Sequence, residues 1–342
     1  MNLKQLSESL GLSQTTVSRA LNGYSDVNEA TRERVVETAK RLGYKPNAMA
    51  RRLAMGKADA VGLVYPLDAL DMGDPRFLEV IEGLTDALNA NDIDVLIASA
   101  GKANELKTYE RLIRGHRVDG LIVARTLIKD PRIQYLRQAK FPFVSYGRTQ
   151  DPSAFSWFDF DNELGCRLAV RRLVGFGHQH IAYIHASLNM NFARQRYEGF
   201  MAEMREAALP VNPDWVKDAG FAPRSGYDAM RALLAAETRP TAIVVDNNLA
   251  GVGVLQALYE AGLKVGEDCS VIVYDGVPQT VFTNHSELTS VEQATPYEAG
   301  KKLAELIQGV MQGKPLSELQ VLWKPSIRAG HSDGPVGPQS RR

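Results

Sequence analysis

The sequence predicts a small all-α head followed by an α/β body of two doubly wound parallel-sheet subdomains. Short amphipathic helices separated by turn residues fill the first 45 positions. From residue 58 onward, continuous apolar runs alternate with helical stretches, the pattern of parallel strands covered on both faces. This alternation is too long for one sheet, and 342 residues suffice for two or three domains.

The head begins with two short helices. Leu3, Leu6 and Leu10 share one face of the first, Gly11 ends it, and Ser13 caps the second. Val17, Ala20 and Leu21 form the inner face of the second helix, whose outer face carries Gln14, Thr15, Thr16, Ser18 and Arg19. Two helices joined by a Gly turn, the second polar and basic outside, predict a helix-turn-helix. A surface helix with a merely solvated polar face is the alternative interpretation.

A third helix and a short linker follow. Residues 29–42 predict a helix whose inner stripe is Val35, Val36, Ala39 and Leu42, with Gly43 as its stop. Residues 46–58 contain Pro46, suited to a helix start, then good helix formers up to Gly56. A helix this short is marginal alone and needs a partner to form.

The body is read from its apolar runs. Predicted strands are 60–65, 94–99, 120–124, 142–146, 181–185, 242–245 and 270–274. Predicted helices between them include 77–89, 108–116, 162–173 and 193–207. The Gly-, Pro-, Ser- and Arg-rich residues 331–342 predict a disordered tail.

Charge is distributed unevenly although the net formal charge is zero. Residues 1–57 carry ten Lys/Arg against five Asp/Glu, and the other 285 carry 30 against 35. A basic head on an acidic body is expected if only the head meets phosphates.

The remaining chemistry is sparse. Cys166 and Cys269 fit no metal-ligand spacing; a disulfide is possible, but the sequence favours buried free thiols of a reducing cytoplasm. His178 and His180 have no nearby third ligand, so we expect a helix-ending turn and no metal. No export signal or membrane-spanning run is present, which predicts a cytoplasmic protein. No nucleophile triad or dinucleotide-binding glycine motif indicates an enzyme, and no cofactor is expected.

Several motifs together carry a family resemblance. They are Thr-Val-Ser-Arg-Ala-Leu-Asn at 16–22, Thr-Arg-Glu-Arg-Val at 31–35, Gly-Tyr-x-Pro-Asn-x-x-Ala-x-x-Leu at 43–53, Arg-x-Arg-x-x-Gly-Phe at 194–200 and Leu-Thr-Ser-Val-x-Gln at 288–293. Over residues 2–330 the chain resembles the lactose-repressor/galactose-repressor (LacI/GalR) family. It departs from the family pattern at Gln14-Thr15, where a glutamine or tyrosine often starts the recognition helix, and at Asp275-Gly276, where paired acids are frequent.

The resemblance implies a homodimeric repressor with a periplasmic-binding-protein-like body. Its domains would be the DNA-binding head (1–45), a hinge helix (46–58), the effector-binding and dimerisation body (59–330) and the tail (331–342). Within the body we expect an N-terminal subdomain at about 59–158 and 293–322, and a C-terminal subdomain at about 159–292 and 323–330. No leucine heptad follows Arg328, which predicts a dimer rather than a tetramer.

Double-stranded operator DNA is the first expected partner. Gln14 and Thr15 are assigned to base choice, Arg19 to a base or an adjacent phosphate, and Ser18 to the same groove. Phosphate-contact candidates are Ser13, Thr16, Asn22, Tyr44 and Asn47, with Ser13 equally suited to a pure capping role. The resemblance implies that Leu53 wedges into a central base step, with Ala50 allowing close approach; a buried turn residue is the alternative.

A small sugar is the second expected partner. Arg196 would be the forked donor to adjacent hydroxyls, and Asn247 and Asp275 follow apolar strands at the crevice edge. Further candidates are Gln293, the rings of Tyr65, Phe77 and Phe221, and the side chains of Asp68 and Arg148. Asp275 could instead cap a turn, and Tyr65 could belong to the core.

We therefore expect a repressor released by a small carbohydrate, best an α-glucoside disaccharide such as sucrose or trehalose. A corepressor-dependent regulator is the main alternative. A sugar-transport binding protein and an α/β enzyme are less favoured.

Overall fold

A computed structural model describes residues 2–44, 56–65, 75–101, 104–278 and 287–337. The predicted hinge positions Asn47, Ala50 and Leu53 and the predicted effector residue Asp68 lie outside the described residues.

The head is a three-helix unit built from α1 (Leu3–Leu10), α2 (Gln14–Leu21) and α3 (Glu29–Arg41). Gly11, at φ 64°, ends α1, and the Ser13 side chain accepts a hydrogen bond from the Thr16 backbone N–H at the start of α2, as predicted. Leu6, Val17, Ala20, Val27, Val35 and Ala39 form the core. Leu42 was predicted to face inward but is 38% exposed, because α3 ends at Arg41 and Leu42 is already its C-cap.

The N-terminal subdomain contains a parallel sheet in the order β11-β5-β4-β3-β1-β2. The strands are β1 (Ala60–Tyr65), β2 (Asp94–Ser99), β3 (Gly120–Ala124), β4 (Phe143–Tyr146), β5 (Ser156–Phe160) and β11 (Gln320–Trp323). Helices α5 (Pro75–Asn89) and α12 (Pro296–Met311) cover one face. The other face packs against α6 (Glu105–Arg114) and α7 (Pro131–Gln138), and a 3-10 turn at Leu316–Glu318 precedes β11.

The C-terminal subdomain has the sheet order β12-β10-β9-β8-β6-β7. Its strands are β6 (Ile181–His185), β7 (Val216–Asp218), β8 (Ala242–Val245), β9 (Ser270–Tyr274), β10 (Ser290–Glu292) and the antiparallel β12 (Ser326–Arg328). Helices α8 (Asn162–Gly175) and α9 (Asn191–Glu206) cover one face, and α10 (Pro223–Leu234) and α11 (Asn248–Glu260) cover the other. A 3-10 turn at Pro213–Trp215 precedes β7.

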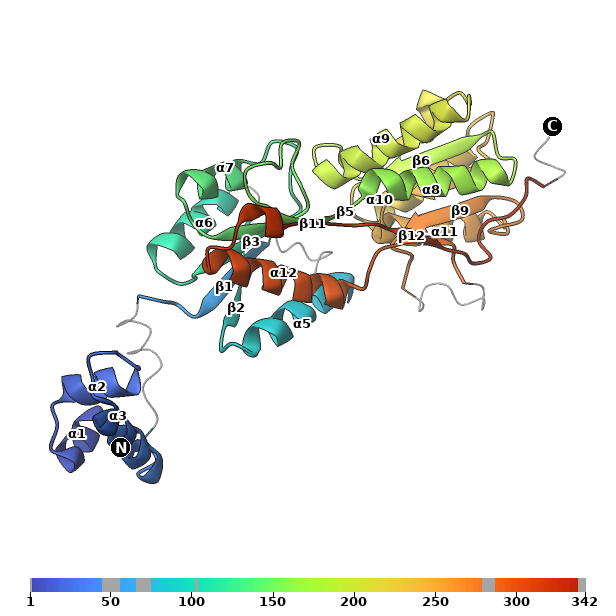
Figure 1. The fold of residues 1–342 in the computed structure, drawn as a ribbon. Coiled ribbons are helices and arrows are strands. Elements are labelled where there is room, and N and C mark those ends of the chain that lie inside the picture. The colour runs from blue at the N-terminus through green and yellow to red at the C-terminus, as the bar shows by residue number, and fades with distance from the viewer. Residues whose placement is uncertain (1, 45–55, 66–74, 102–103, 279–286, 338–342) are drawn as a thin grey trace.

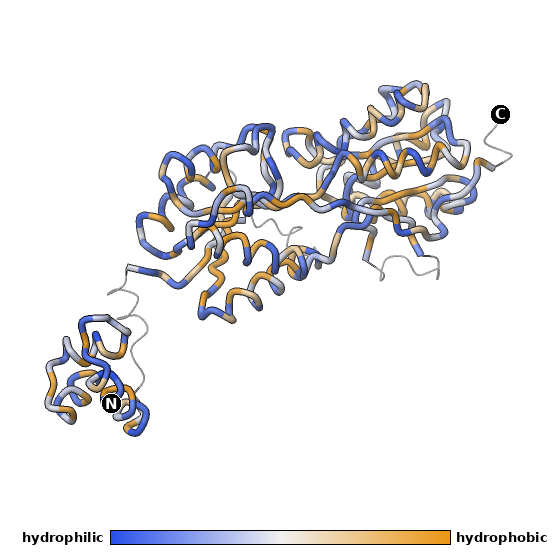
Figure 2. The backbone as a smooth tube through the Cα atoms, in the orientation of Figure 1, coloured by the Kyte–Doolittle hydropathy of each residue, from blue (hydrophilic) through white to orange (hydrophobic). Residues whose placement is uncertain are grey.

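Each subdomain is therefore a three-layer α/β/α unit, which confirms the predicted fold class (Figure 1). Apolar residues concentrate along the central strands and the helix faces that cover them (Figure 2). Close helix pairing depends on glycine: a Cβ on Gly199 of α9 would collide with the carbonyl oxygen of Glu163 at the start of α8.

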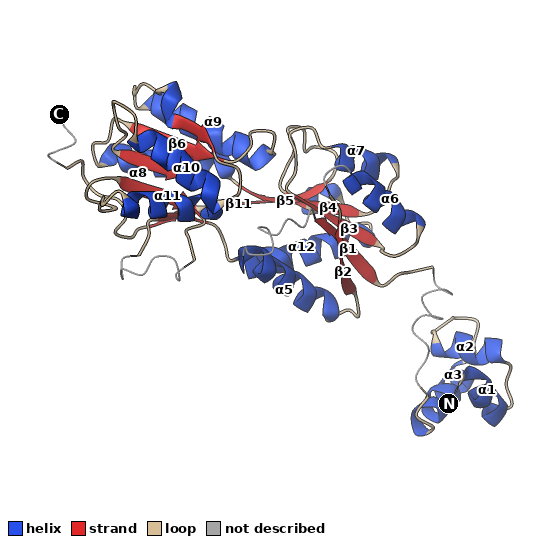
Figure 3. Cartoon of the chain, turned by 180° about the vertical axis from the view of Figure 1, so that it is seen from behind, coloured by secondary structure: helices blue, strands red, loops and turns tan. Residues whose placement is uncertain are grey.

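Three chain crossings join the subdomains. The chain passes from one sheet to the other after β5 and after β10, and again between β11 and β12. The two sheets consequently lie end to end with the crossings between them (Figure 3). The carboxyl ends of the parallel strands in the N-terminal subdomain point toward this junction, where a crevice is expected in open α/β folds.

The C-terminal residues correct one prediction. Disorder was expected from residue 331 onward, but Ser332 and Asp333 are buried against the C-terminal subdomain. The Ser332 hydroxyl donates to the Val271 carbonyl oxygen over 2.6 Å and accepts from the Thr289 backbone N–H over 2.8 Å. The composition of this segment indicated disorder because it contains few apolar residues. Its polar groups are instead ordered by hydrogen bonds to residues that are distant in the sequence.

The two thiols agree with their prediction. Cys166 and Cys269 are both free and buried, and burial raises the pKa of each to about 12. Among the described residues, no helix is both long and apolar enough to span a bilayer.

Candidate functional site

The outer face of α2 forms a shallow groove on the head. Gln14, Thr15, Ser18, Arg19 and Asn22 line it together with Leu3 and Tyr24. The groove therefore collects five of the residues predicted to contact DNA. Amide, hydroxyl and guanidinium groups on one exposed helix face can bond base edges and phosphates.

Arg19 contacts two residues that follow α2. Its guanidinium lies 2.6 Å from an Asp26 carboxylate oxygen and 5.0 Å from the centroid of the Tyr24 ring. Sequence reasoning missed Tyr24 and Asp26, because both follow α2 and no helical spacing marks them. Ser13 and Thr16 lie beside the groove, and Ser13 caps the start of α2. Tyr44 packs partly against the core of the head.

A second cavity, of about 200 Å³, lies between the two subdomains. Seven predicted effector residues line it: Tyr65, Phe77, Arg196, Phe221, Asn247, Asp275 and Gln293. Sequence reasoning missed Arg76, Arg125, Thr126, Tyr146, Asp159, Phe160, Asn162, Phe192 and Asn248. Most of the lining residues lie at or just after the carboxyl ends of strands. The rule that ligands bind at these ends predicted Asn247, and it would also have found Arg125 after β3.

Arg196 forms the floor of the cavity on the side of the C-terminal subdomain. Its side chain is 6% exposed, its Nε donates to Asn162 Oδ1 over 2.9 Å, and its Nη1 donates to the Asp246 carbonyl oxygen. The guanidinium lies 3.4 Å from the Tyr274 ring centroid. Burial disfavours its charge, but nearby Tyr274, Asp275 and Asp246 outweigh that effect and raise the pKa of Arg196. It is therefore a fixed cation with its fork partly turned to the cavity.

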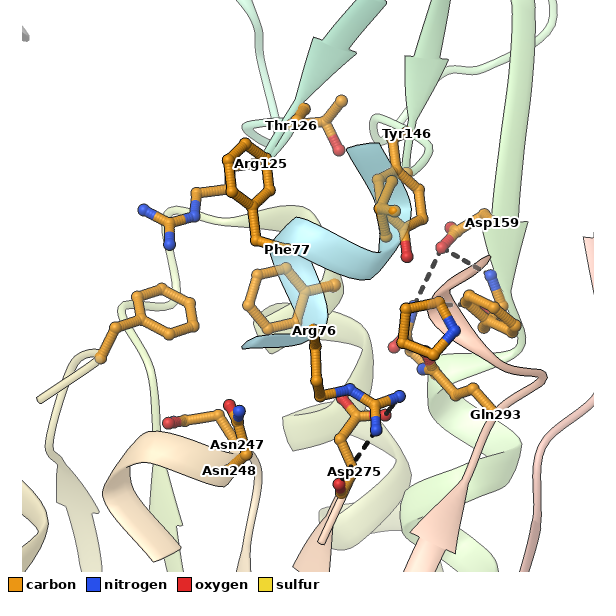
Figure 4. A pocket seen from close by; sticks show the side chains of 18 of the residues that line it. Arg76, Phe77, Arg125, Thr126, Tyr146, Asp159, Asn247, Asn248, Asp275 and Gln293 are labelled. Carbon is orange, nitrogen blue, oxygen red and sulfur yellow. Dashed lines mark hydrogen bonds and ion pairs between the residues drawn. The ribbon is translucent and has the colours of Figure 1, made fainter. Parts of the chain in front are cut away.

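Asp275 receives arginines from both subdomains. Arg76, near the start of α5, donates to the Asp275 carboxylate and to its carbonyl oxygen, each over 3.2 Å (Figure 4). Arg196 lies 4.0 Å from the other carboxylate oxygen. Asp275 has φ 67°, in the left-handed region that L residues rarely adopt. A ligand hydroxyl pair that binds Asp275 would therefore meet a carboxylate already engaged across the cavity.

Arg125 joins the subdomains on the opposite wall. Its guanidinium lies 4.7 Å from the Tyr65 ring centroid in one subdomain and 5.0 Å from the Phe221 ring centroid in the other. Beside it, the Asn191 backbone N–H donates to the Thr126 carbonyl oxygen over 2.9 Å. Leu127 and Met190 form an isolated antiparallel bridge. Side-chain and main-chain contacts thus close this wall.

Arg148 corrects a second prediction, because it does not line the cavity. Its Nε donates to Asp159 Oδ2 over 2.8 Å, and its guanidinium lies 5.4 Å from the Trp157 ring centroid. Burial raises the pKa of Asp159, and Arg148 is the cation that opposes this shift. Arg148 was predicted as a ligand contact, but a buried carboxylate one strand away takes its charge.

Comparison with known proteins decides the family. Residues 3–47 match the family described as bacterial regulatory proteins, lacI family, and residues 58–318 match the family of periplasmic binding proteins and the sugar-binding domain of the LacI family. The chain belongs to the LacI family. The predicted resemblance is confirmed: this is a LacI-type, DNA-binding transcriptional regulator with a sugar-binding-type body.

Individual relatives match over nearly their full length. The HTH-type transcriptional regulator RafR of Escherichia coli is 36% identical over 96% of this chain and 98% of its own. The regulator AglR of Rhizobium meliloti is 35% identical over 99% and 96%. A solved putative transcriptional regulator from Yersinia pestis superposes with a TM-score of 0.76 at 38% identity, covering 82% of this chain and 99% of that one. A CelR–cellobiose complex gives 0.73 at 28% identity, covering 97% and 99%.

Proposed function

We propose that this regulator is a homodimeric repressor that leaves a palindromic operator when a small sugar fills the cavity between its subdomains. An α-glucoside disaccharide such as sucrose or trehalose is the best candidate. The observation that carries the proposal is the Arg76–Asp275–Arg196 arrangement, in which one carboxylate is shared by cations from the two subdomains. As a DNA-binding regulator it would act in the cytoplasm, where the bacterial chromosome lies.

The lining suits a pyranoside. Phe77, whose ring stacks on Tyr65 with centroids 4.0 Å apart, lines one subdomain and Phe221 lines the other, so apolar sugar faces can meet an aromatic ring on each side. The forked donor Arg196, the amide of Asn247 and the carboxylate of Asp275 can bond adjacent hydroxyls. The related CelR was solved with cellobiose, which supports a ligand of two sugar units.

Coupling to DNA follows from the shared carboxylate. A sugar that binds Asp275 competes with Arg76, so occupancy changes the contacts holding the two subdomains together. Such a change would move the N-terminal subdomains of the dimer relative to each other, and the marginal hinge helices at 46–58 would lose their pairing. DNA affinity then falls.

On the DNA, we propose that Gln14 and Thr15 choose bases and that Arg19, held by Asp26, contacts a base or a neighbouring phosphate. Ser18 would lie in the same groove. Phosphates would be contacted by Ser13, Thr16, Asn22, Tyr44 and Asn47. Leu53 would wedge into the central base step, with Ala50 allowing the close approach.

The test combines duplex and sugar titrations of the purified full chain. Fluorescence anisotropy with a panel of palindromic duplexes should find one preferred over random duplex, and a disaccharide should release it. Tightening of the complex by a small molecule would favour a corepressor instead. No preference for any palindrome, with or without sugars, would contradict DNA regulation, and turnover of a bound sugar would indicate an enzyme.

A further inference from the structure

A group of exposed cations lies at the end of the N-terminal subdomain remote from the cavity. Parallel strands β4, β3 and β1 are neighbours, so the segments preceding them lie along one edge of the sheet. Six exposed side chains on or beside these segments define the basic edge: Lys57, Arg111, Arg114, Arg117, Arg137 and Lys140. Figure 1 shows β1 beginning at this end, away from the C-terminal subdomain.

Cations outnumber acids along the basic edge. Asp151 lies close enough to Arg137 for that cation to help lower the pKa of the carboxyl, after its hydrogen bonds from Ser153, and Asp92 and Asp94 lie at or just before the start of the neighbouring strand β2. Residues 56–59, 110–119 and 137–142 contain six Lys/Arg and three acids, Asp59, Glu110 and Asp119. The Asp119 carboxylate already accepts hydrogen bonds from the backbone N–H groups of Ala58 and Asp59, over 2.8 and 2.7 Å. Within the part of the chain that the structure describes, none of the six cations forms an ion pair.

Helix ends explain only part of this pattern. Arg111 and Arg114 belong to the last turn of α6, and Arg137 belongs to the last turn of α7, where cations offset the helix dipole. Lys57, Arg117 and Lys140 lie outside these helices, so the dipole gives no reason for their charge. The body as a whole carries more acids than bases, which makes a local excess of cations a departure from its surroundings.

The position of the basic edge suggests what it meets. The chain that carries the head enters the body at residues 56–58, and Asp119 fixes that point by its two hydrogen bonds. Residues 45–55 are the whole connection to the head, and at about 3.3–3.6 Å per residue they span at most roughly 40 Å. The head is therefore tethered to the end of the body that carries the basic edge, and exposed charges interact strongly only within about 8 Å, the Debye length at physiological salt.

We propose that the basic edge is a second phosphate-binding surface, which contacts the backbone of the duplex that the head reads. This inference rests on the proposed operator binding. The basic edge adds affinity without sequence preference, because phosphate contacts carry no base information. The acidic body thus takes part in DNA binding through one edge only.

The experiment measures how duplex affinity depends on salt in the full-length dimer. Arg114→Gln/Arg117→Gln removes two exposed cations from each subunit and four from the dimer, so the slope of log affinity against log salt should become shallower by roughly 2–4, since each phosphate contact contributes about 0.9. Affinity for the preferred palindrome and for random duplex should fall by similar factors. The charge-conserving Arg114→Lys/Arg117→Lys should retain the wild-type slope.

A matched control separates the basic edge from net charge. Arg224→Gln/Lys264→Gln removes two cations of the C-terminal subdomain, whose side chains are 80% and 71% exposed, and should leave the slope unchanged. An unaltered slope in the first variant, or an equal loss in this control, would overturn the inference. If the first variant folds poorly by circular dichroism, Lys57→Gln/Lys140→Gln replaces it with the same expected result. Wild-type protein without any palindrome preference would instead refute operator binding itself.

Discussion

Arg196 shows how one side chain reaches its role only through distant partners. Its guanidinium lies over the ring of Tyr274 from β9 and bonds Asn162 at the start of α8 and the carbonyl of Asp246 after β8. Three elements far apart in the sequence therefore fix its fork. A buried arginine held this way loses little further freedom when it binds hydroxyls.

Replacing Arg196 should separate DNA binding from the sugar response. We expect Arg196→Ala to weaken sugar binding by about 2–4 kcal/mol, because the loss leaves hydroxyls and the Asp246 carbonyl oxygen without a charged donor. Operator affinity without sugar should persist. Calorimetry and anisotropy measure the two properties. The control is Arg194→Ala, two residues earlier on α9 and outside the cavity lining; an Arg196→Ala protein that answers sugar at normal concentrations would disprove the role of the cavity.

His178 makes stability depend on pH. Its Nε2 lies 3.0 Å from the Gly334 carbonyl oxygen and its Nδ1 lies 2.8 Å from the Thr241 hydroxyl, which suits a neutral ring. Burial lowers the pKa of His178 below its usual 6.5. Because the unfolded chain then binds the proton more readily, the free energy of unfolding should fall as pH drops below about 6.5 and stay constant above it for this group.

Denaturant unfolding at pH 7.5 and pH 5.5 checks this expectation. His178→Gln should show a smaller difference between the two pH values than the wild type. The exposed neighbour His180 provides the control, since His180→Gln should keep the wild-type difference. Equal pH dependence in the His178→Gln protein would contradict the assignment.

At the scale of elements, the C-terminal segment at residues 330–337 acts as a structural part of the second subdomain. Within this segment, Asp333 has a fully buried side chain. Its carboxylate pairs with Arg172 of α8 and accepts a hydrogen bond from the Thr289 hydroxyl. The segment therefore ties α8 to the sheet edge where the last strands pair. No contact of this kind can be read from a Gly- and Ser-rich composition.

Removing the Asp333 carboxylate should destabilise the protein. We expect Asp333→Ala to lower the free energy of unfolding by about 1–3 kcal/mol, because the Thr289 hydroxyl and the partly exposed Arg172 lose their shared acceptor. Thermal and denaturant unfolding report the change. A wild-type stability of Asp333→Ala would show that the segment is only loosely attached.

For the molecule as a whole, the question is how the cavity and the head communicate. The subdomains touch through Arg76–Asp275 on one wall, and through Arg125 and the Thr126–Asn191 hydrogen bond on the other. A ligand shifts such an equilibrium only by binding one arrangement better than another. In the proposed function the shared Asp275 would offer that difference, because a sugar bound to its carboxylate would compete with Arg76.

The proposed wedge residue provides a prediction on this scale. Leu53→Ala should lower operator affinity by at least roughly tenfold. The wedge is worth up to a few kcal/mol in the bent complex, and about 1.4 kcal/mol already corresponds to tenfold. Sugar affinity should not change, because the cavity lies in the body. Anisotropy and calorimetry on the same preparation measure both. Unchanged operator affinity would remove Leu53 from the DNA interface.

The sequence by itself determined the head, the alternation of strands and helices in the body, seven of the twelve described strands, and the family. These features depend on local rules: helix periodicity, caps such as Ser13, and apolar runs such as 60–65 and 181–185 that became β1 and β6. It also found seven of the cavity residues, but it missed others that follow strand ends, such as Arg125 and Asn248. It misplaced Leu42 because α3 ends one residue earlier than predicted, and it misplaced Arg148 and the tail because their partners are distant in the sequence.

Only the tertiary structure decided which charges are paired and which remain available. Arg148 is held by Asp159 and Arg76 by Asp275, while the six cations of the basic edge have no ion pair within the described part of the chain. Electrostatic energy depends on distance and burial, which spacing along the chain does not reveal. For that reason the sequence could name the arginines, and the fold alone could assign them to the core, the cavity or the surface.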